Sequence, residues 1–242
     1  MTRTLTIISL LPHLLNTNGD AENARVLAQR ARWSGHDASV VTVTNRADLP
    51  DVVDAIVIGS GSDAALTEAR DVLLTMVDKL REWTTAGVPL LAVGTGWELL
   101  SWGIELTDGK VIEGLGLVAG RAVPRLTRAT DDLVVTSKHG RLVGFENHAR
   151  DYVGAEASPL GRVAYGAGNG NGGEGLVMGD VVGTHLHGPV LARNPRLADH
   201  LLTAALRRAG VDYAPGERTI SVDAVAEAAR DRVAAGLSLP SA

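Results

Sequence analysis

The chain has 242 residues, no cysteine and a formal net charge of −5, with 45% hydrophobic and 21% charged residues. These values are typical of a globular protein with one large or two small domains, and the lack of a basic run argues against nucleic acid as a partner. No stretch approaches the roughly 20 apolar residues of a membrane span, and a chain without cysteine has neither disulfides nor thiolate zinc sites.

The first hundred residues predict a largely parallel sheet covered by helices. Apolar runs indicate strands over residues 4–10, 38–44 and 55–59. We expect Asp20 to cap a helix over residues 21–34, which Gly35 ends. A second, long helix is expected to begin at Ser62 or Asp63 and to run through Trp83. The alternation of strands and helices favours an α/β fold.

The N-terminal apolar segment predicts a strand rather than a targeting signal. It is broken at Pro12, is too short for a signal peptide and has no small-residue cleavage site. We therefore expect a cytoplasmic protein with no membrane span.

The stretch from Pro89 to Trp102 is the most informative part of the chain. An apolar run leads into Gly94-Thr95-Gly96, and a helix-like apolar pattern follows. A strand, a sharp turn and a helix in this order are typical of a nucleophile elbow, in which the turn holds a Ser or Cys above the sheet. Here the apex is Gly94, so the sequence predicts the scaffold without the nucleophile. The plainer interpretation is that the glycines only permit a tight turn.

The second half predicts shorter strands and two closing helices. We expect a hairpin that turns near His139-Gly140, three further strands, a core helix capped by Asn194, a linker and a terminal amphipathic helix. The corresponding ranges are 132–136 and 142–145 for the hairpin, 161–165, 176–178 and 181–185 for the strands, 195–208 for the core helix, 211–218 for the linker and 221–235 for the last helix. The simplest division is one domain over residues 1–210, followed by a linker and C-terminal helix over 211–242.

Three polar segments are further candidates for chemistry. His185 and His187 share a face if they lie on a strand, where they suit a general base at the sheet rim, half of a metal site, or a structural pair. The segment Arg141–His148 suits either a pocket wall or a capped turn. The glycine-rich segment 166–175 lacks the Lys-Ser/Thr ending of a phosphate loop, so we interpret it as a mobile surface loop.

Several motifs, taken in order, resemble the GatD-type glutamine amidotransferase subunits, which are close to the cobyric-acid-synthase-like class I glutaminase domains. The resemblance covers roughly residues 4–210. It rests on the segments 11–20 with Asn23, 58–63, 91–94, 144–148, 184–189 and 193–195.

The resemblance implies a class I amidotransferase fold, a mostly parallel mixed sheet flanked by helices with an elbow turn. It also implies glutamine as the substrate, no cofactor, and a MurT-like Mur-ligase partner with which the family amidates the D-glutamate of lipid II in peptidoglycan synthesis.

The same resemblance assigns roles to five positions. It places His187 at the catalytic histidine, Arg128 at the arginine that binds the glutamine carboxylate, Gly61 in the oxyanion pocket, Gly94 at the nucleophilic cysteine and Glu98 at a substrate-contacting glutamine. In the family the partner subunit is thought to supply the carboxylate that orients the histidine, and here the position two residues after His187 is a proline.

Gly94 closes the thiol route and leaves several hypotheses. An engineered exchange would change the nucleophile alone. Two further positions also depart from the family, Glu98 in place of a glutamine and His185 in place of a tyrosine. These departures favour a natural degenerate paralogue. The chain is then a glutaminase subunit with absent or reduced activity, or a catalytically inactive binding or regulatory subunit of a Mur-ligase-like partner. A metal-dependent hydrolase that uses His185 and His187 is the third hypothesis.

Overall fold

Parallel strands form the centre of the structure, a computed structural model that describes residues 4–240. The central sheet has the order β11-β12-β4-β3-β1-β2, and every neighbouring pair is parallel except β11 and β12. Its strands are β1 (Leu5–Leu10), β2 (Ala38–Val43), β3 (Ala55–Ile58), β4 (Leu90–Val93), β11 (Leu176–Met178) and β12 (Val181–Thr184). The predicted mostly parallel α/β fold is confirmed.

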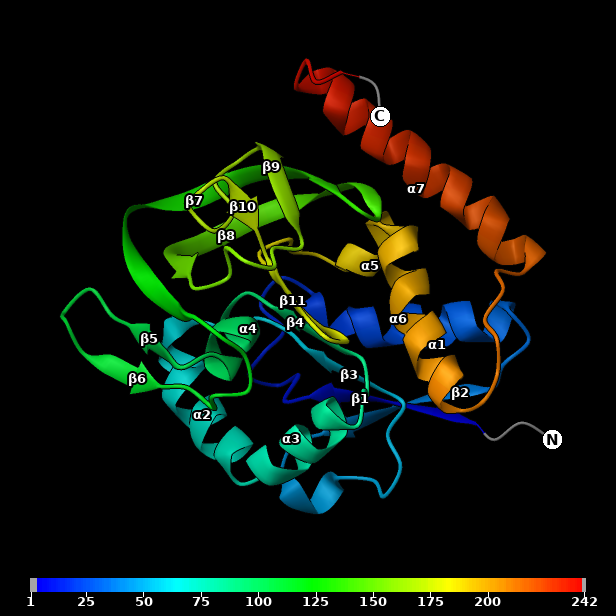
Figure 1. Cartoon of the computed structure of the whole chain (residues 1–242), viewed down its shortest axis with the longest axis horizontal. Coiled ribbons are helices and arrows are strands. Elements are labelled where there is room, and N and C mark those ends of the chain that lie inside the picture. Colours follow the sequence, from blue (N-terminus) through cyan, green and yellow to red (C-terminus); the bar gives the residue numbers. More distant parts are fainter. Residues whose placement is uncertain (1–3, 241–242) are drawn as a thin grey trace.

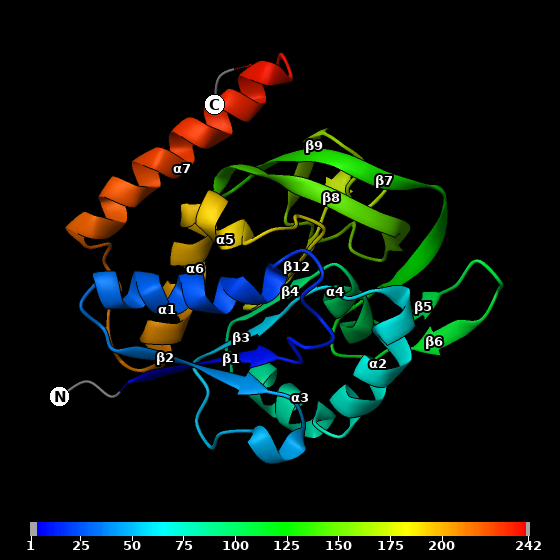
Figure 2. The same ribbon diagram turned by 180° about the vertical axis from the view of Figure 1, so that it is seen from behind.

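Helices cover both faces of this sheet, as Figures 1 and 2 show. The helices α1 (Asn23–Trp33), α5 (Val190–Arg193) and α6 (Pro195–Arg208) pack on one face, and α2 (Leu66–Leu74), α3 (Val77–Thr85) and α4 (Thr95–Leu100) pack on the other. Residues of β3 and β4 are fully buried because they are covered from both sides.

The single long helix predicted through Trp83 is wrong, because it breaks between α2 and α3. The Thr75 hydroxyl donates to the Val72 carbonyl at 2.7 Å, and the Thr75 and Met76 amides also bond three residues back. These tighter bonds end α2, and the buried Met76 turns into the core before α3 begins.

A second, mainly antiparallel sheet lies beside the carboxyl ends of the central strands (Figure 1). It contains β5 (Gly103–Glu105), β6 (Val111–Glu113), β7 (Arg121–Ser137), β8 (Gly140–Val153), β9 (Gly161–Tyr165) and β10 (Gly173–Glu174). The predicted hairpin at His139-Gly140 is confirmed, although β7 and β8 extend far beyond the predicted ranges. A backbone bridge between Phe145 and His187 joins this sheet to the end of β12.

Two polar side chains predicted to cap helices serve the tertiary structure instead. Asp20 begins a 3₁₀ turn before α1 without capping it, and its carboxylate reaches His187. Asn194 precedes α6 as predicted, but its side chain bonds the Val143 backbone N–H at 2.8 Å and the Val143 carbonyl at 2.9 Å. Both are buried, and a buried polar group binds whichever partner its surroundings leave unpaired.

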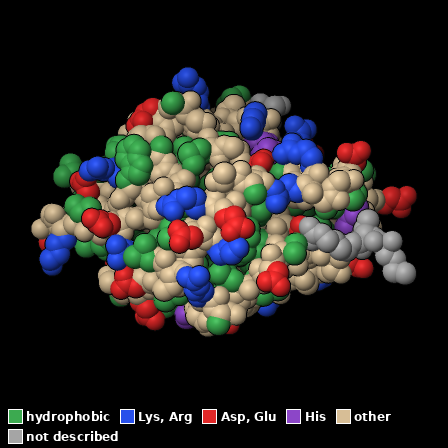
Figure 3. Space-filling model, turned by 60° about the horizontal axis from the view of Figure 1, so that its bottom comes forward, with side chains coloured by type: hydrophobic (Ala, Val, Ile, Leu, Met, Phe, Trp, Pro, Cys, Tyr) green, Lys and Arg blue, Asp and Glu red, His purple; other side chains and the backbone are tan. Residues whose placement is uncertain are grey.

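The terminal helix α7 (Glu217–Gly236) lies at the outer side of the molecule, where it contacts α1, α5 and β8 (Figure 2). It buries only Thr219 and Ala234, so the predicted amphipathic stripe is wrong. Its main polar anchor is Asp223, which pairs with the buried Arg30 of α1. Within residues 4–240, no helix combines the length and apolar character needed to cross a membrane. The face in Figure 3 mixes charges of both signs.

Candidate active site

The turn after β4 has the backbone of a nucleophile elbow. Gly94 has φ 52° and ψ −124°, and its N–H donates to the Thr184 carbonyl at 2.9 Å. A Cβ built on Gly94 would lie 2.6 Å from Ser60 Oγ and 2.7 Å from His187 Cε1. The apex therefore faces a histidine, and a serine hydroxyl fills the space that a side chain at position 94 would need.

His187 is held by a carboxylate of the same chain. Its Nδ1 lies 2.9 Å from Asp20 Oδ2, and the Asn18 amide lies 3.0 Å from the same nitrogen. Because a carboxylate only accepts hydrogen bonds, the Asp20 contact assigns the proton to Nδ1 and leaves the Nε2 lone pair free. The Asn18 Nδ2, which only donates, then lies beside Nδ1 without bonding to it. Nε2 is buried and has no hydrogen-bond partner within residues 4–240. His187 is therefore arranged as a general base, and a carboxylate of the same chain, which the sequence did not predict for this role, lies in position to orient it.

The Asp20–His187 pair joins distant parts of the sequence through the sheet. Asp20 follows β1 and His187 follows β12, and both strands end at the same edge of the central sheet. Ser60 and Gly61 follow β3 at that edge, and Gly94 follows β4. Parallel strands bring their carboxyl ends together, which is why residues 20, 60, 94 and 187 meet in one place.

The amide of Gly61, predicted for the oxyanion pocket, and the neighbouring amide of Thr95 are already engaged. Gly61 N–H donates to Thr95 Oγ1 at 2.6 Å, and Thr95 N–H donates to Ser60 Oγ at 3.3 Å. The two hydroxyls are 3.2 Å apart. A substrate oxyanion has to displace these hydroxyls to use either amide.

A buried ion pair lies beside the elbow. Arg150 of β8 donates to Glu98 of α4 at 2.8 Å and to Asp63 at 2.8 Å. Burial raises the pKa of Glu98, against the opposing effect of the guanidinium. Hydrogen bonding to Arg150 lowers the pKa of Asp63. Glu98 thus already has a strong internal partner within the site.

His185 and His187 diverge rather than forming a pair. His185 Nδ1 lies 3.2 Å from Glu174, and its ring stacks on His148 at 4.1 Å between centroids. Burial and the neighbouring His148 lower the pKa of His185 to about 4. No group of three or more side chains placed to hold a metal was found among residues 4–240. The two histidines thus have separate carboxylate partners.

The polar segment 141–148 and the glycine-rich segment 166–175 meet at Glu146. The first is neither a capped turn nor a loop, because it lies within β8. Glu146 accepts hydrogen bonds from the Ala167 and Gly168 amides at 2.6 and 2.9 Å, and Asn169 bonds Gly175 in both directions. The glycine-rich segment, predicted to be a mobile surface loop, is thus tied to β8 and partly buried.

Five predicted site residues line one cavity of about 320 Å³, namely Gly61, Gly94, Glu98, Arg128 and His187. Arg128 is exposed at its rim and donates to Asn147 Oδ1 at 2.7 Å. Asp20, Ser60 and Arg150 were not identified from the sequence. Asp20 was interpreted as a helix cap, and Ser60 lies in an ordinary turn sequence. Arg150 lies just beyond the polar segment 141–148.

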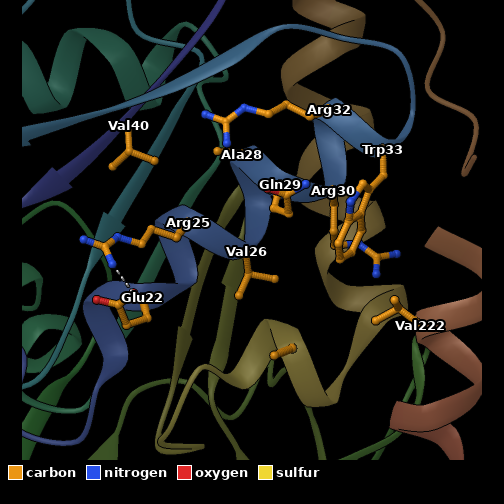
Figure 4. Close-up of a pocket in the computed structure, with 11 residues that line it drawn as sticks. Glu22, Arg25, Val26, Ala28, Gln29, Arg30, Arg32, Trp33, Val40 and Val222 are labelled. Carbon is orange, nitrogen blue, oxygen red and sulfur yellow. Dashed lines mark ion pairs between the residues drawn. The ribbon is translucent and has the colours of Figure 1, made fainter. Parts of the chain in front are cut away.

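A larger hollow of about 640 Å³ lies away from this site, against α1 and α7 (Figure 4). Its lining includes Trp33, Val26 and Val222, and an ion pair between Glu22 and Arg25 at 3.3 Å. Arg30 also lines it, but its guanidinium is paired with Asp199 and Asp223. Apolar side chains form much of this lining, and the charged groups Glu22, Arg25 and Arg30 are already paired.

Sequence comparisons agree with the geometry. Residues 6–195 match the CobB/CobQ-like glutamine amidotransferase domain. A Staphylococcus aureus protein, the GatD subunit of lipid II isoglutaminyl synthase (glutamine-hydrolyzing), is 34% identical over 218 residues, which cover 88% of this chain and 89% of that protein. The Streptococcus pneumoniae GatD subunit is 31% identical over 211 residues, covering 84% and 81%.

Solved structures share the fold at lower identity. One glutamine amidotransferase superposes with a TM-score of 0.56 at 21% identity, covering 84% of this chain and 99% of that chain. Another, from Thermotoga maritima, has a TM-score of 0.52 at 14% identity and covers 95% and 93%. With the family match and the GatD relatives, the chain belongs to the CobB/CobQ-like glutamine amidotransferase family, as a GatD-type member.

Proposed function

We propose that this chain is the glutamine-handling subunit of a cytoplasmic complex that amidates the D-glutamate of lipid II, with a MurT-like Mur ligase as its partner. The names of the two GatD relatives support the reaction. The observation that carries the proposal is His187, held by Asp20, facing an elbow at the end of β4.

In this proposal glutamine occupies the cavity at the edge of the sheet. Its α-carboxylate pairs with Arg128 at the rim, and its side-chain amide points toward Gly94 and His187, which line the same cavity. His187 Nε2 accepts a proton during attack on the amide and returns it to the leaving ammonia. The partner ligase then uses the ammonia.

The test measures binding and amidation separately. The chain is purified with the MurT-like subunit of its own genome, and lipid II amidation is followed with ATP and either glutamine or ammonium. Arg128→Ala should weaken glutamine binding, measured by calorimetry, by about tenfold or more, while ammonium-driven amidation persists. Arg121→Ala is the matched control, since Arg121 lies on the same strand and pairs with Glu105 outside the cavity. Unchanged glutamine binding in Arg128→Ala, or no binding by the parent chain, would refute the proposal.

A second candidate is a subunit that binds the ligase without hydrolysing glutamine. Two observations favour it. The amides of Gly61 and Thr95 already donate to hydroxyls of the chain, and Glu98 is already paired with Arg150. This candidate predicts that the complex amidates lipid II with ammonium and not with glutamine.

A further inference from the structure

Ser60 occupies the place of the missing nucleophile. Its Oγ lies 2.6 Å from the position of a Cβ on Gly94, which is within the space that a cysteine side chain would fill. The side chain is buried, with 5% of its surface exposed, and it lines the same cavity as His187. The absence of a side chain at Gly94 is what leaves room for this hydroxyl. We propose that Ser60 is the nucleophile of this chain.

A base for Ser60 is present on the other side of the same point. His187 Cε1 lies 2.7 Å from the built Cβ, so the imidazole and the hydroxyl converge there from two strands. His187 Nε2 is buried with no hydrogen-bond partner in the described part of the chain, and Asp20 holds the opposite nitrogen. Ser60, His187 and Asp20 thus have the order of a hydroxyl nucleophile, its base and the carboxylate that orients the base.

The hydrogen bonds that Ser60 Oγ now makes with Thr95 are long, so they can be given up for a hydrogen bond to His187. Thr95 N–H reaches Ser60 Oγ at 3.3 Å, and the Ser60 and Thr95 hydroxyls are 3.2 Å apart, whereas hydroxyl bonds are usually near 2.7–2.8 Å. Rotation of the Ser60 side chain toward His187 frees the Thr95 N–H. That amide is then available to the oxyanion of the substrate.

The reaction rests on glutamine being the ligand, as proposed above, and it needs only water as a co-reactant. His187 Nε2 takes the Ser60 proton while Oγ bonds to the amide carbon of glutamine. The carbon–nitrogen bond then breaks, the proton passes from His187 to nitrogen, and ammonia leaves a glutamyl ester on Ser60. Water, deprotonated by His187, attacks the ester carbon. Glutamate leaves, and Ser60 regains its proton.

The experiment uses the full chain with its MurT-like partner and the glutamine analogue 6-diazo-5-oxo-L-norleucine. A hydroxyl nucleophile displaces N₂ from the diazomethyl carbon and passes its proton to that carbon, so the adduct has the mass of the analogue less N₂. Peptide mass spectrometry should locate this adduct on Ser60. Ser60→Ala should slow labelling by about 100-fold or more and ammonia release likewise, with glutamine binding by calorimetry within about threefold.

The matched control is Ser9→Ala. Ser9 is a buried serine of β1 in the central sheet with 4% of its surface exposed, and it does not line the cavity. Its labelling should equal that of the parent chain. Ser60→Cys should be labelled at the new thiol, and His187→Ala should slow that labelling, which keeps the test independent of how Ser60→Ala folds.

The two proposals fail in different ways. If glutamine binds but no adduct forms, if the adduct lies on another residue such as Thr95, or if Ser60→Ala is labelled at the parental rate, the Ser60 proposal is overturned and the proposed function stands. If calorimetry detects no glutamine binding, the proposed function fails and the glutaminase role of Ser60 fails with it.

Discussion

At the scale of single residues, Gly94 and Ser60 form one unit. The elbow backbone at Gly94 has positive φ, a conformation that costs a side chain about 1–3 kcal/mol, and the space in front of it is filled by Ser60 and His187. A cysteine at position 94 would therefore strain the backbone and force the Ser60 side chain to move. The effect of Gly94 on the site thus depends on which residue stands at position 60.

We predict that Gly94→Cys alone is destabilised and does not become an efficient glutaminase. Overpacking against Ser60 should cost about 2 kcal/mol and lower Tm by roughly 4–8 °C. Gly94→Cys with Ser60→Gly removes the collision with Ser60 but keeps the contact with His187 and the backbone strain, so it should recover part of the Tm and release ammonia from glutamine faster than the single variant. Calorimetry and an ammonia assay measure both. Equal Tm values for the single and double variants would show that the two positions do not compete for space.

A second residue-scale prediction concerns Asp20. Asp20→Asn should reduce ammonia release and diazo-analogue labelling by roughly 10²- to 10⁴-fold, because an amide does not hold His187 with its proton on Nδ1. Glutamine binding should change little, since Asp20 is behind the histidine. Glu22→Gln is the control, because Glu22 lies in the same turn and pairs with the surface residue Arg25. Full activity in Asp20→Asn with the partner present would mean that the partner supplies the orienting carboxylate.

At the scale of elements, the long hairpin forms one wall of the site. β8 places Arg150 against Glu98 of α4, and the Phe145–His187 bridge attaches the same strand to the segment after β12. The second sheet therefore contributes Arg128 and Arg150 to the cavity, while the central sheet positions the elbow and the base. This division explains why the charge at the site depends on a contact between residues 52 positions apart.

We predict that Arg150→Met lowers the free energy of unfolding by roughly 3–5 kcal/mol, because it leaves the Glu98 carboxylate buried without its cation. Arg150→Met with Glu98→Met should recover most of that loss, since two apolar side chains replace the pair. Urea unfolding of the two single variants and the double variant gives the coupling energy. Strict additivity of the two substitutions would contradict the buried pair.

The terminal helix is the other element with a separable role. We propose that residues 1–210 form the amidotransferase domain and that the linker and α7 dock on it. A chain ending at residue 215 should fold and bind glutamine with unchanged affinity, because α7 lines no part of the 320 Å³ cavity. It should lose stability, since Arg30 retains Asp199 but loses Asp223. Calorimetry and urea unfolding test both statements, and loss of glutamine binding would refute the division.

At the scale of the whole molecule, two neutral histidines, one buried and one half-buried, connect stability to pH. Burial lowers the pKa of both His185 and His139 to about 4, with neighbouring histidines adding to the effect. In the unfolded chain these rings titrate near 6.5. Between pH 6.5 and 4 the unfolded state therefore binds more protons than the native state, so acid favours unfolding.

We predict that the stability contributed by these two histidines is fully present above about pH 6.5 and is lost progressively as the pH falls toward 4. His185→Phe or His139→Gln should make the free energy of unfolding less dependent on pH across that window. Urea unfolding at several pH values between 7 and 4 measures the slope. An unchanged slope in both variants would mean that other groups dominate acid unfolding.

The sequence by itself determined the secondary elements of the central sheet, the elbow at Gly94 and the histidine after the last parallel strand. These features are local, since apolar runs, glycine turns and motif order are properties of neighbouring residues. The broken helix at Thr75 and the non-capping roles of Asp20 and Asn194 escaped prediction because each depends on which partner a folded neighbour leaves available. Only the tertiary structure decided that Asp20 meets His187, that Arg150 neutralises Glu98 and that Ser60 fills the space in front of Gly94. Those contacts form where parallel strands that are far apart in the chain end at the same edge of the sheet, and a local sequence pattern carries no information about such long-range contacts.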